Sequence, residues 1–242
     1  MRLNALLAAC LSACTLAAAP VRVIFDTDMC GDYDDVGALA VLNALADAGE
    51  CEILAVLSSS RRSPALGMCE MINESYRGFV ARLADAREIP MGVCKGIGYV
   101  APEEKGVNAV FRSMVAVRRE SLRYPDSDAA PDANDVYRRV LADAPDGSVT
   151  LCTVGFLTNV RRLLETPGDA VSPLTGRELV AKKVAAWYAM GGRLPGGVED
   201  ECRRVAVDLP GAAQRDVPHA DAKQKVSAFE RSCFTVISSF LS

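Results

Sequence analysis

Five aspartates lie within ten residues near the beginning of the chain: Asp26, Asp28, Asp32, Asp34 and Asp35. Carboxylates this close repel one another strongly unless a cation compensates them. Their oxygen atoms are the ligands that Ca²⁺ and Mg²⁺ prefer. The spacing therefore predicts a site for a hard divalent cation, in which Gly31 would permit the tight turn that brings the carboxylates together.

A purely structural role accounts for only part of this cluster. Asp34 and Asp35 stand where a helix is predicted to begin, and negative charge is stabilising there by about 0.3–1 kcal/mol. Helix capping and a solvated acidic loop would explain one or two aspartates. Five of them directly after a β-prone run at residues 21–25 favour a metal site.

The segments that must position this cluster alternate between strand and helix patterns. Strands are predicted at 21–25, 52–57, 148–154 and 183–190, and helices from residue 35 to about 48 and at 65–84, 135–142 and 157–165. This alternation predicts an α/β fold, a mostly parallel sheet with helices on both faces and a Rossmann-like core. Ligands bind such sheets beyond the carboxyl ends of the strands. We therefore expect the site after Asp26, after Val154 and after Met190.

The composition fits one globular domain that does not bind nucleic acid. The chain has 242 residues, of which 50% are hydrophobic, enough for an α/β domain with a sizeable core. Its net charge is -4 and no basic patch stands out. We expect most of the arginine pairs to be solvated: Arg61–Arg62, Arg118–Arg119, Arg138–Arg139, Arg161–Arg162 and Arg203–Arg204.

Residues 1–19 are predicted to be a secretory signal peptide, because a basic start precedes an apolar stretch and three alanines. The protein would then be exported, to the periplasm or outside the cell. Residues 11–14 also resemble a bacterial lipobox, so a lipoprotein anchored at Cys14 stays open. Past residue 20 no apolar stretch reaches the length of a membrane span.

The cysteines do not predict a zinc site. There are nine, two of them in the predicted signal peptide, and none has a CxxC or CxxH spacing. Export would permit disulfides, whose pairing stays open. Most of the remaining thiols, such as Cys94 and Cys152, are expected to be small core residues.

Four motifs between residues 21 and 215 together resemble one enzyme family. They are Asp26-Thr27-Asp28 with Asp34-Asp35, then Val154-Gly155-Phe156-Leu157-Thr158-Asn159, Ala189-Met190-Gly191-Gly192, and Asp208-Leu209-Pro210-Gly211-Ala212-Ala213. In this order they resemble the inosine/uridine-preferring nucleoside hydrolases. The resemblance implies a nucleoside hydrolase-like fold at 20–215 and a divergent tail at 216–242. It also implies hydrolysis of the N-glycosidic bond of a ribonucleoside by a metal-bound water, with a homo-oligomer as one option.

The resemblance implies a role for each aspartate of the cluster. Asp28 would bind Ca²⁺ and act as general base, Asp35 would bind the same ion, and Asp34 would hold the ribose 2′-hydroxyl. Asp26 and Asp32 would support the cluster, and the Val154 carbonyl would be a further metal ligand. These roles suit the chemistry, because the reaction passes through an oxocarbenium-like sugar and a metal can both acidify water and orient ribose.

The sequence departs from the family at the substrate side. Ser60, Arg61 and Arg62 stand where the family has a substrate-binding asparagine, and only Glu199 or Glu201 stands where a Glu-x-Asn is usual. After Ala213 the resemblance fades, and the tail supplies neither a further acidic ligand motif nor, apart from His219, a histidine. These departures predict slow or absent nucleoside hydrolysis, in a divergent or truncated copy.

Two other functions compete with this one. An exported, non-catalytic protein that binds sugar or metal would retain the aspartates without the substrate residues. A haloacid-dehalogenase-type phosphatase also begins with a strand and an Asp-x-Asp. The latter leaves the pair Asp34-Asp35 without a role and lacks the expected small residues after Asp28.

Overall fold

The structure of the protein is a computed structural model that describes residues 19–31, 33–76, 88–96 and 107–190. Residues 1–18 of the predicted signal peptide, the tail at 216–242 and the motif at 208–213 lie outside the described residues. So do three predicted site residues, Asp32, Glu199 and Glu201.

Strands and helices alternate along the described chain. The order is β1 (Val21–Thr27), α2 (Asp34–Asp47), β2 (Cys51–Ser58), α3 (Ala65–Tyr76), β3 (Met91–Val93), α5 (Val107–Arg118), the short 3₁₀ turns η1 (Arg119–Ser121) and η2 (Ser127–Ala129), α6 (Ala133–Asp143), β4 (Val149–Thr153), α7 (Thr158–Glu165), α8 (Gly176–Lys183) and β5 (Val184–Ala189).

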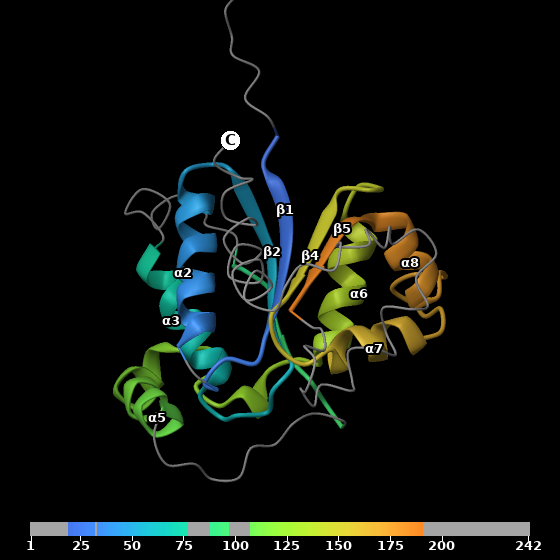
Figure 1. Ribbon diagram of the computed structural model, residues 1–242. Coiled ribbons are helices and arrows are strands. Elements are labelled where there is room, and N and C mark those ends of the chain that lie inside the picture. The colour runs from blue at the N-terminus through green and yellow to red at the C-terminus, as the bar shows by residue number, and fades with distance from the viewer. Residues whose placement is uncertain (1–18, 32, 77–87, 97–106, 191–242) are drawn as a thin grey trace, which may run out of the picture.

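The strands form one parallel sheet in the order β3-β2-β1-β4-β5 (Figure 1). The chain runs outward from β1 through β2 to β3, then returns to the other side of β1 with β4 and β5. The order therefore reverses between β1 and β4, and the carboxyl ends of these two strands are where such sheets bind ligands. The predicted α/β fold with a mostly parallel sheet is confirmed.

Helices cover both faces of this sheet. Helices α2 and α3 pack on one face against β2, and α6 packs on the other against β2 and β3, with α7 and α8 beside it (Figure 1). Alternate side chains of β1 enter two apolar clusters: Val23 and Phe25 join the α2 side, and Ile24 joins the α6 side. This alternation decides on which face Asp26 lies.

Three elements were not predicted from the sequence. Strand β3 has only three residues, too few to show a pattern, and no element was predicted where α5 lies. Helix α8 begins with a capping box between Thr175 and Glu178, a signal that the sequence does carry. Because α8 extends to Lys183, β5 begins one residue later than predicted. Within the described residues, no helix is long and apolar enough to cross a membrane.

Candidate functional site at the carboxyl end of the central strand

Asp26 lies in the interior of the protein. It is 1% exposed. Tyr137 of α6 donates its hydroxyl to Asp26 Oδ2 at 2.9 Å, and Asn159 of α7 donates its amide Nδ2 to Asp26 Oδ1 at 3.0 Å. The predicted supporting residue thus joins the end of β1 to two helices on the same face of the sheet.

Burial changes the protonation of Asp26. Loss of solvent raises the pKa of Asp26 from 3.8 to about 7, although the hydrogen bonds from Tyr137 and Asn159 lower it. The nearby charge of Asp28 raises it further. Near neutral pH this carboxyl group is therefore close to half protonated, which reduces the negative charge of the cluster.

Asp28 and Asp35 come together just beyond the end of β1. Their carboxyl groups are joined by a hydrogen bond, and Asp35 is 2% exposed. Burial raises the pKa of Asp28, and the positive charge of Arg62 opposes this increase. Two carboxyl groups in contact need a proton or a cation between them, so this pair is where a metal ion would reduce the repulsion most.

The turn between β1 and α2 differs from the prediction. Cys30, and not Gly31, has the positive φ, 81°, and its side chain is fully buried. A left-handed conformation at a residue other than glycine costs about 1–3 kcal/mol, so packing of the Cys30 side chain must stabilise this turn. Asp34 is exposed, and its Oδ1 accepts a hydrogen bond at 2.9 Å from the Asp35 amide at the beginning of α2.

The segment after β4 packs directly against the end of β1. Val154 N donates to the Asp26 carbonyl at 2.8 Å, which places this predicted carbonyl ligand beside the cluster. A Cβ atom on Gly155 would overlap the Asp28 amide nitrogen and lie 2.6 Å from Ser59 Oγ. Only glycine therefore permits this close approach of the two backbones.

Arg62 lies beside Asp28, in the segment where the resembled family has an asparagine. Its Nη1 donates to the Asp28 carbonyl at 3.2 Å. A Cβ on Gly31 would lie 3.1 Å from the same nitrogen and 3.8 Å from Asp28 Oδ2. The expected solvation of the arginine pairs does not describe Arg62, which is half-buried, or Arg138, whose side chain is 1% exposed.

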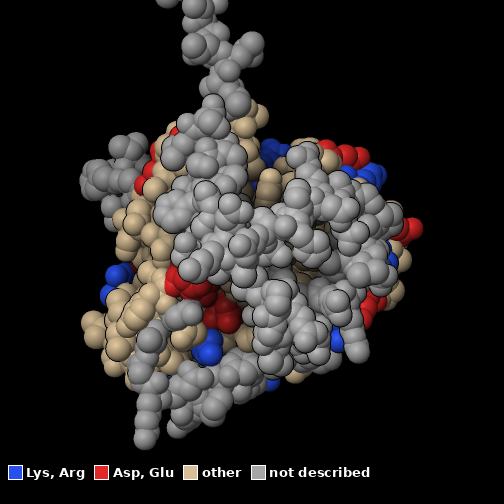
Figure 2. Space-filling model, in the orientation of Figure 1, with Lys and Arg blue, Asp and Glu red and all other residues tan. Residues whose placement is uncertain are grey.

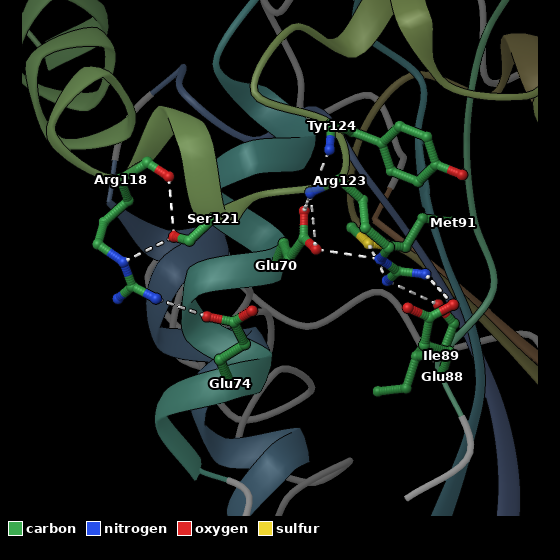
Figure 3. Close-up of polar contacts among 9 residues, drawn as sticks. All are labelled: Glu70, Glu74, Glu88, Ile89, Met91, Arg118, Ser121, Arg123 and Tyr124. Atoms are coloured by element: carbon green, nitrogen blue, oxygen red, sulfur yellow. Dashed lines mark hydrogen bonds and ion pairs between the residues drawn. The ribbon is translucent and has the colours of Figure 1, made fainter.

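A network on α3 fixes the segment at residues 119–131 to this helix and to the beginning of β3 (Figure 3). The buried carboxylate of Glu70 accepts hydrogen bonds from the Arg123 amide at 3.1 and 3.0 Å, and from Arg123 Nε at 3.0 Å. Further along, Ser127 Oγ donates to the Ser63 carbonyl at 2.9 Å. The segment therefore enters the carboxyl edge of the sheet at a defined position, next to Arg61.

Sequence reasoning missed Tyr137 and gave no role to Asn159 or Arg62. Asn159 belongs to the motif at 154–159, so its position in that motif was a usable signal. The contact of Tyr137 with Asp26 spans 111 residues, and no local pattern indicates it.

The ligand atoms that the described residues offer are oxygens, which is the kind that a hard cation prefers. Asp28 and Asp35 offer carboxylate oxygens, and the Val154 backbone lies beside them. Among the described residues, no three His, Cys, Asp or Glu side chains form a group that could hold a metal. Ca²⁺ accepts backbone carbonyls and water besides carboxylates, so this donor set fits it.

Taken together, the fold and the site define an α/β protein with a parallel sheet and an acidic site at the carboxyl end of its central strand. No known family model and no curated protein matches the sequence. Among solved structures, the chain is similar to the type III effector protein XopQ, determined in complex with adenosine diphosphate ribose, with 20% identity and a TM-score of 0.47 over 76% of this chain and 48% of that chain. It is similar also to the effector protein XOO4466, with 19% identity and a TM-score of 0.47 over 75% of this chain and 46% of that one. The chain thus spans about half the length of each.

Proposed function

We propose that the carboxyl edge of β1 and β4 binds a ribosyl compound and hydrolyses its N-glycosidic bond with the help of Ca²⁺ or a similar cation. The observation that carries the proposal is the contact between Asp28 and Asp35 at the end of the central strand. The reaction itself comes from the resemblance of the motifs to nucleoside hydrolases.

The aspartates and the Val154 carbonyl would have different roles in this reaction. Asp28, Asp35 and the Val154 carbonyl would hold the cation, which when bound would lower the pKa of a water molecule. Asp28 would accept a proton from that water molecule while the oxygen of the water forms a bond to C1′ of the sugar. The nucleobase would leave with the electron pair of the C1′–N bond and take up a proton from solvent. Asp34, which is exposed at the beginning of α2, would accept a hydrogen bond from a ribose hydroxyl.

A binding protein without catalysis is the second candidate. The observation that favours it is Arg62, which lies beside Asp28 where the resembled family has a substrate asparagine. We therefore expect turnover below about 1 s⁻¹, the lower end of the ordinary range for enzymes.

Release of ribose and thermal melting test the two candidates. A cation at a hundred times its dissociation constant stabilises the fold by about 2.7 kcal/mol, so calcium should raise the melting temperature and a chelator should reverse the effect. Asp35→Asn should abolish both this shift and the release of ribose, whereas Asp47→Asn, exposed near the end of α2, should change neither. Calcium-dependent melting without ribose release would favour the binding protein, and no effect of calcium would contradict the metal site.

A further inference from the structure

Four basic side chains surround the carboxyl ends of β2 and β3, next to the acidic site. We call them the basic rim: Arg61, Arg62, Lys95 and Arg162. Arg61 and Arg62 follow β2, Lys95 follows β3, and Arg162 reaches in from α7. Arg162 Nη1 donates to the Lys95 carbonyl at 2.8 Å, so residues far apart in the sequence meet here.

Two aspartates, Asp128 and Asp132, hold three members of the basic rim in position. Arg61 donates to both carboxylate oxygens of Asp128 at 3.1–3.2 Å, and Lys95 Nζ donates to the Asp128 carbonyl at 2.6 Å. Arg162 pairs with both oxygens of Asp132 at 3.0 and 2.9 Å. Arg62 lies beside Asp28, where its positive charge opposes the increase that burial causes in the pKa of this carboxyl group. Lys95 contacts a backbone carbonyl and no described aspartate side chain, so its charge is the positive excess of the rim.

The carboxyl edge of the sheet is therefore divided by charge. Asp28, Asp34 and Asp35 lie at the end of β1 and the beginning of α2, and the basic rim lies across β2 and β3. In Figure 2 acidic side chains and a basic one stand side by side in the lower middle of the face, where α2 begins in Figure 1. Arg62 joins the two halves through its hydrogen bond to the Asp28 carbonyl.

We propose that the ribosyl ligand carries a phosphate group, which the basic rim binds while the aspartates bind the sugar; this rests on the proposed function. Carboxylates accept hydrogen bonds from sugar hydroxyls, whereas a phosphate is matched by guanidinium and ammonium groups. A neutral nucleoside offers nothing for these charges. Because Asp128 and Asp132 already orient the two bidentate arginines, little side-chain entropy is lost on binding.

The test measures binding of ribose 5-phosphate, ribose and inorganic phosphate by calorimetry. Ribose 5-phosphate should bind at least tenfold more tightly than either ribose or phosphate, and higher salt should weaken it. Arg61→Gln and Lys95→Gln should each weaken ribose 5-phosphate about tenfold to a hundredfold, the range for a hydrogen bond to a charged group. Ribose binding should not change.

A matched control and a second variant keep the result interpretable. Arg118→Gln removes an arginine of a comparable exposed pair, with Glu74 at 2.9 Å, away from the edge, and should change no affinity. Lys95 contacts only a backbone carbonyl of Asp128 among the described bonds, so Lys95→Gln tests the charge even if Arg61→Gln disturbs the fold. Ribose 5-phosphate that binds no better than ribose, or is unaffected by both variants, overturns the proposal.

Hydrolysis assays separate this proposal from the one on which it rests. Adenosine 5′-monophosphate should be hydrolysed at least tenfold more efficiently than adenosine, with the advantage lost in Lys95→Gln. Hydrolysis of adenosine but not of its monophosphate would overturn the phosphate proposal and support the proposed function. Rim-dependent binding of ribose 5-phosphate without any hydrolysis would support the phosphate site and contradict catalysis.

Discussion

Replacement of Asp26 by asparagine should change how the stability of the fold depends on pH. The carboxyl group is 1% exposed, and burial raises its pKa from 3.8 to about 7. An asparagine keeps an acceptor for the Tyr137 hydroxyl and carries no charge. Its NH2 group would face the Asn159 amide that now donates to Asp26 Oδ1, so the Asn159 amide would turn over and accept with Oδ1, which has no hydrogen-bond partner within the described structure.

The sign and size of the effect follow from proton linkage. Between about pH 4 and pH 7 the folded state binds a proton at Asp26 that the unfolded state has lost, so the free energy of unfolding falls as pH rises through this window. The slope is about 1.4 kcal/mol per pH unit, and the total is about 4 kcal/mol. Between pH 5 and pH 8 alone, the wild type should lose about 2–3 kcal/mol relative to Asp26→Asn.

Urea denaturation at several pH values from 5 to 8 measures this difference directly. A chelator should be present, since a bound cation would favour the ionised form of Asp26. The two proteins should be closest in stability at pH 5, with Asp26→Asn gaining steadily toward pH 8. Asp47→Asn, an exposed aspartate on α2, serves as the control and should parallel the wild type. Parallel curves for the wild type and Asp26→Asn would refute the reasoning.

Two further substitutions test the packing around the site. Gly155→Ala forces a Cβ against the backbone at Asp28 and should destabilise the fold by about 1–3 kcal/mol and abolish the calcium shift. Gly37→Ala serves as the control, because it has open space around it, and should be neutral or stabilising. Equal changes in stability for the two variants would contradict the close approach of Gly155 to the backbone at Asp28. Arg138→Met should cost about 1–3 kcal/mol, because it leaves the Ser172 and Leu174 carbonyls without their donor, whereas Asp169 stays in contact with solvent. The exposed Arg139→Met should cost much less in the same denaturation assay.

Local patterns in the sequence were sufficient for the architecture and for the location of the acidic site. The strands that became β1, β2 and β4 are runs of branched and apolar residues between turn-forming residues, and their alternation with helices leads to a parallel sheet. Since ligands bind such sheets at the carboxyl ends of the strands, the residues after β1 and β4 could be named as a candidate site beforehand. Strand β3 could not be predicted from the sequence, because a segment of three residues is too short to show the alternation of a strand.

The tertiary structure alone decided which groups each charged residue of this candidate site contacts. Five aspartates look equivalent in the sequence, yet strand alternation turns Asp26 toward Tyr137 and Asn159, and the following turn brings Asp28 to Asp35. The basic rim likewise combines the ends of β2 and β3 with α7. Burial and charge neighbourhood depend on contacts between residues more than 100 positions apart, and such contacts leave no local pattern to read.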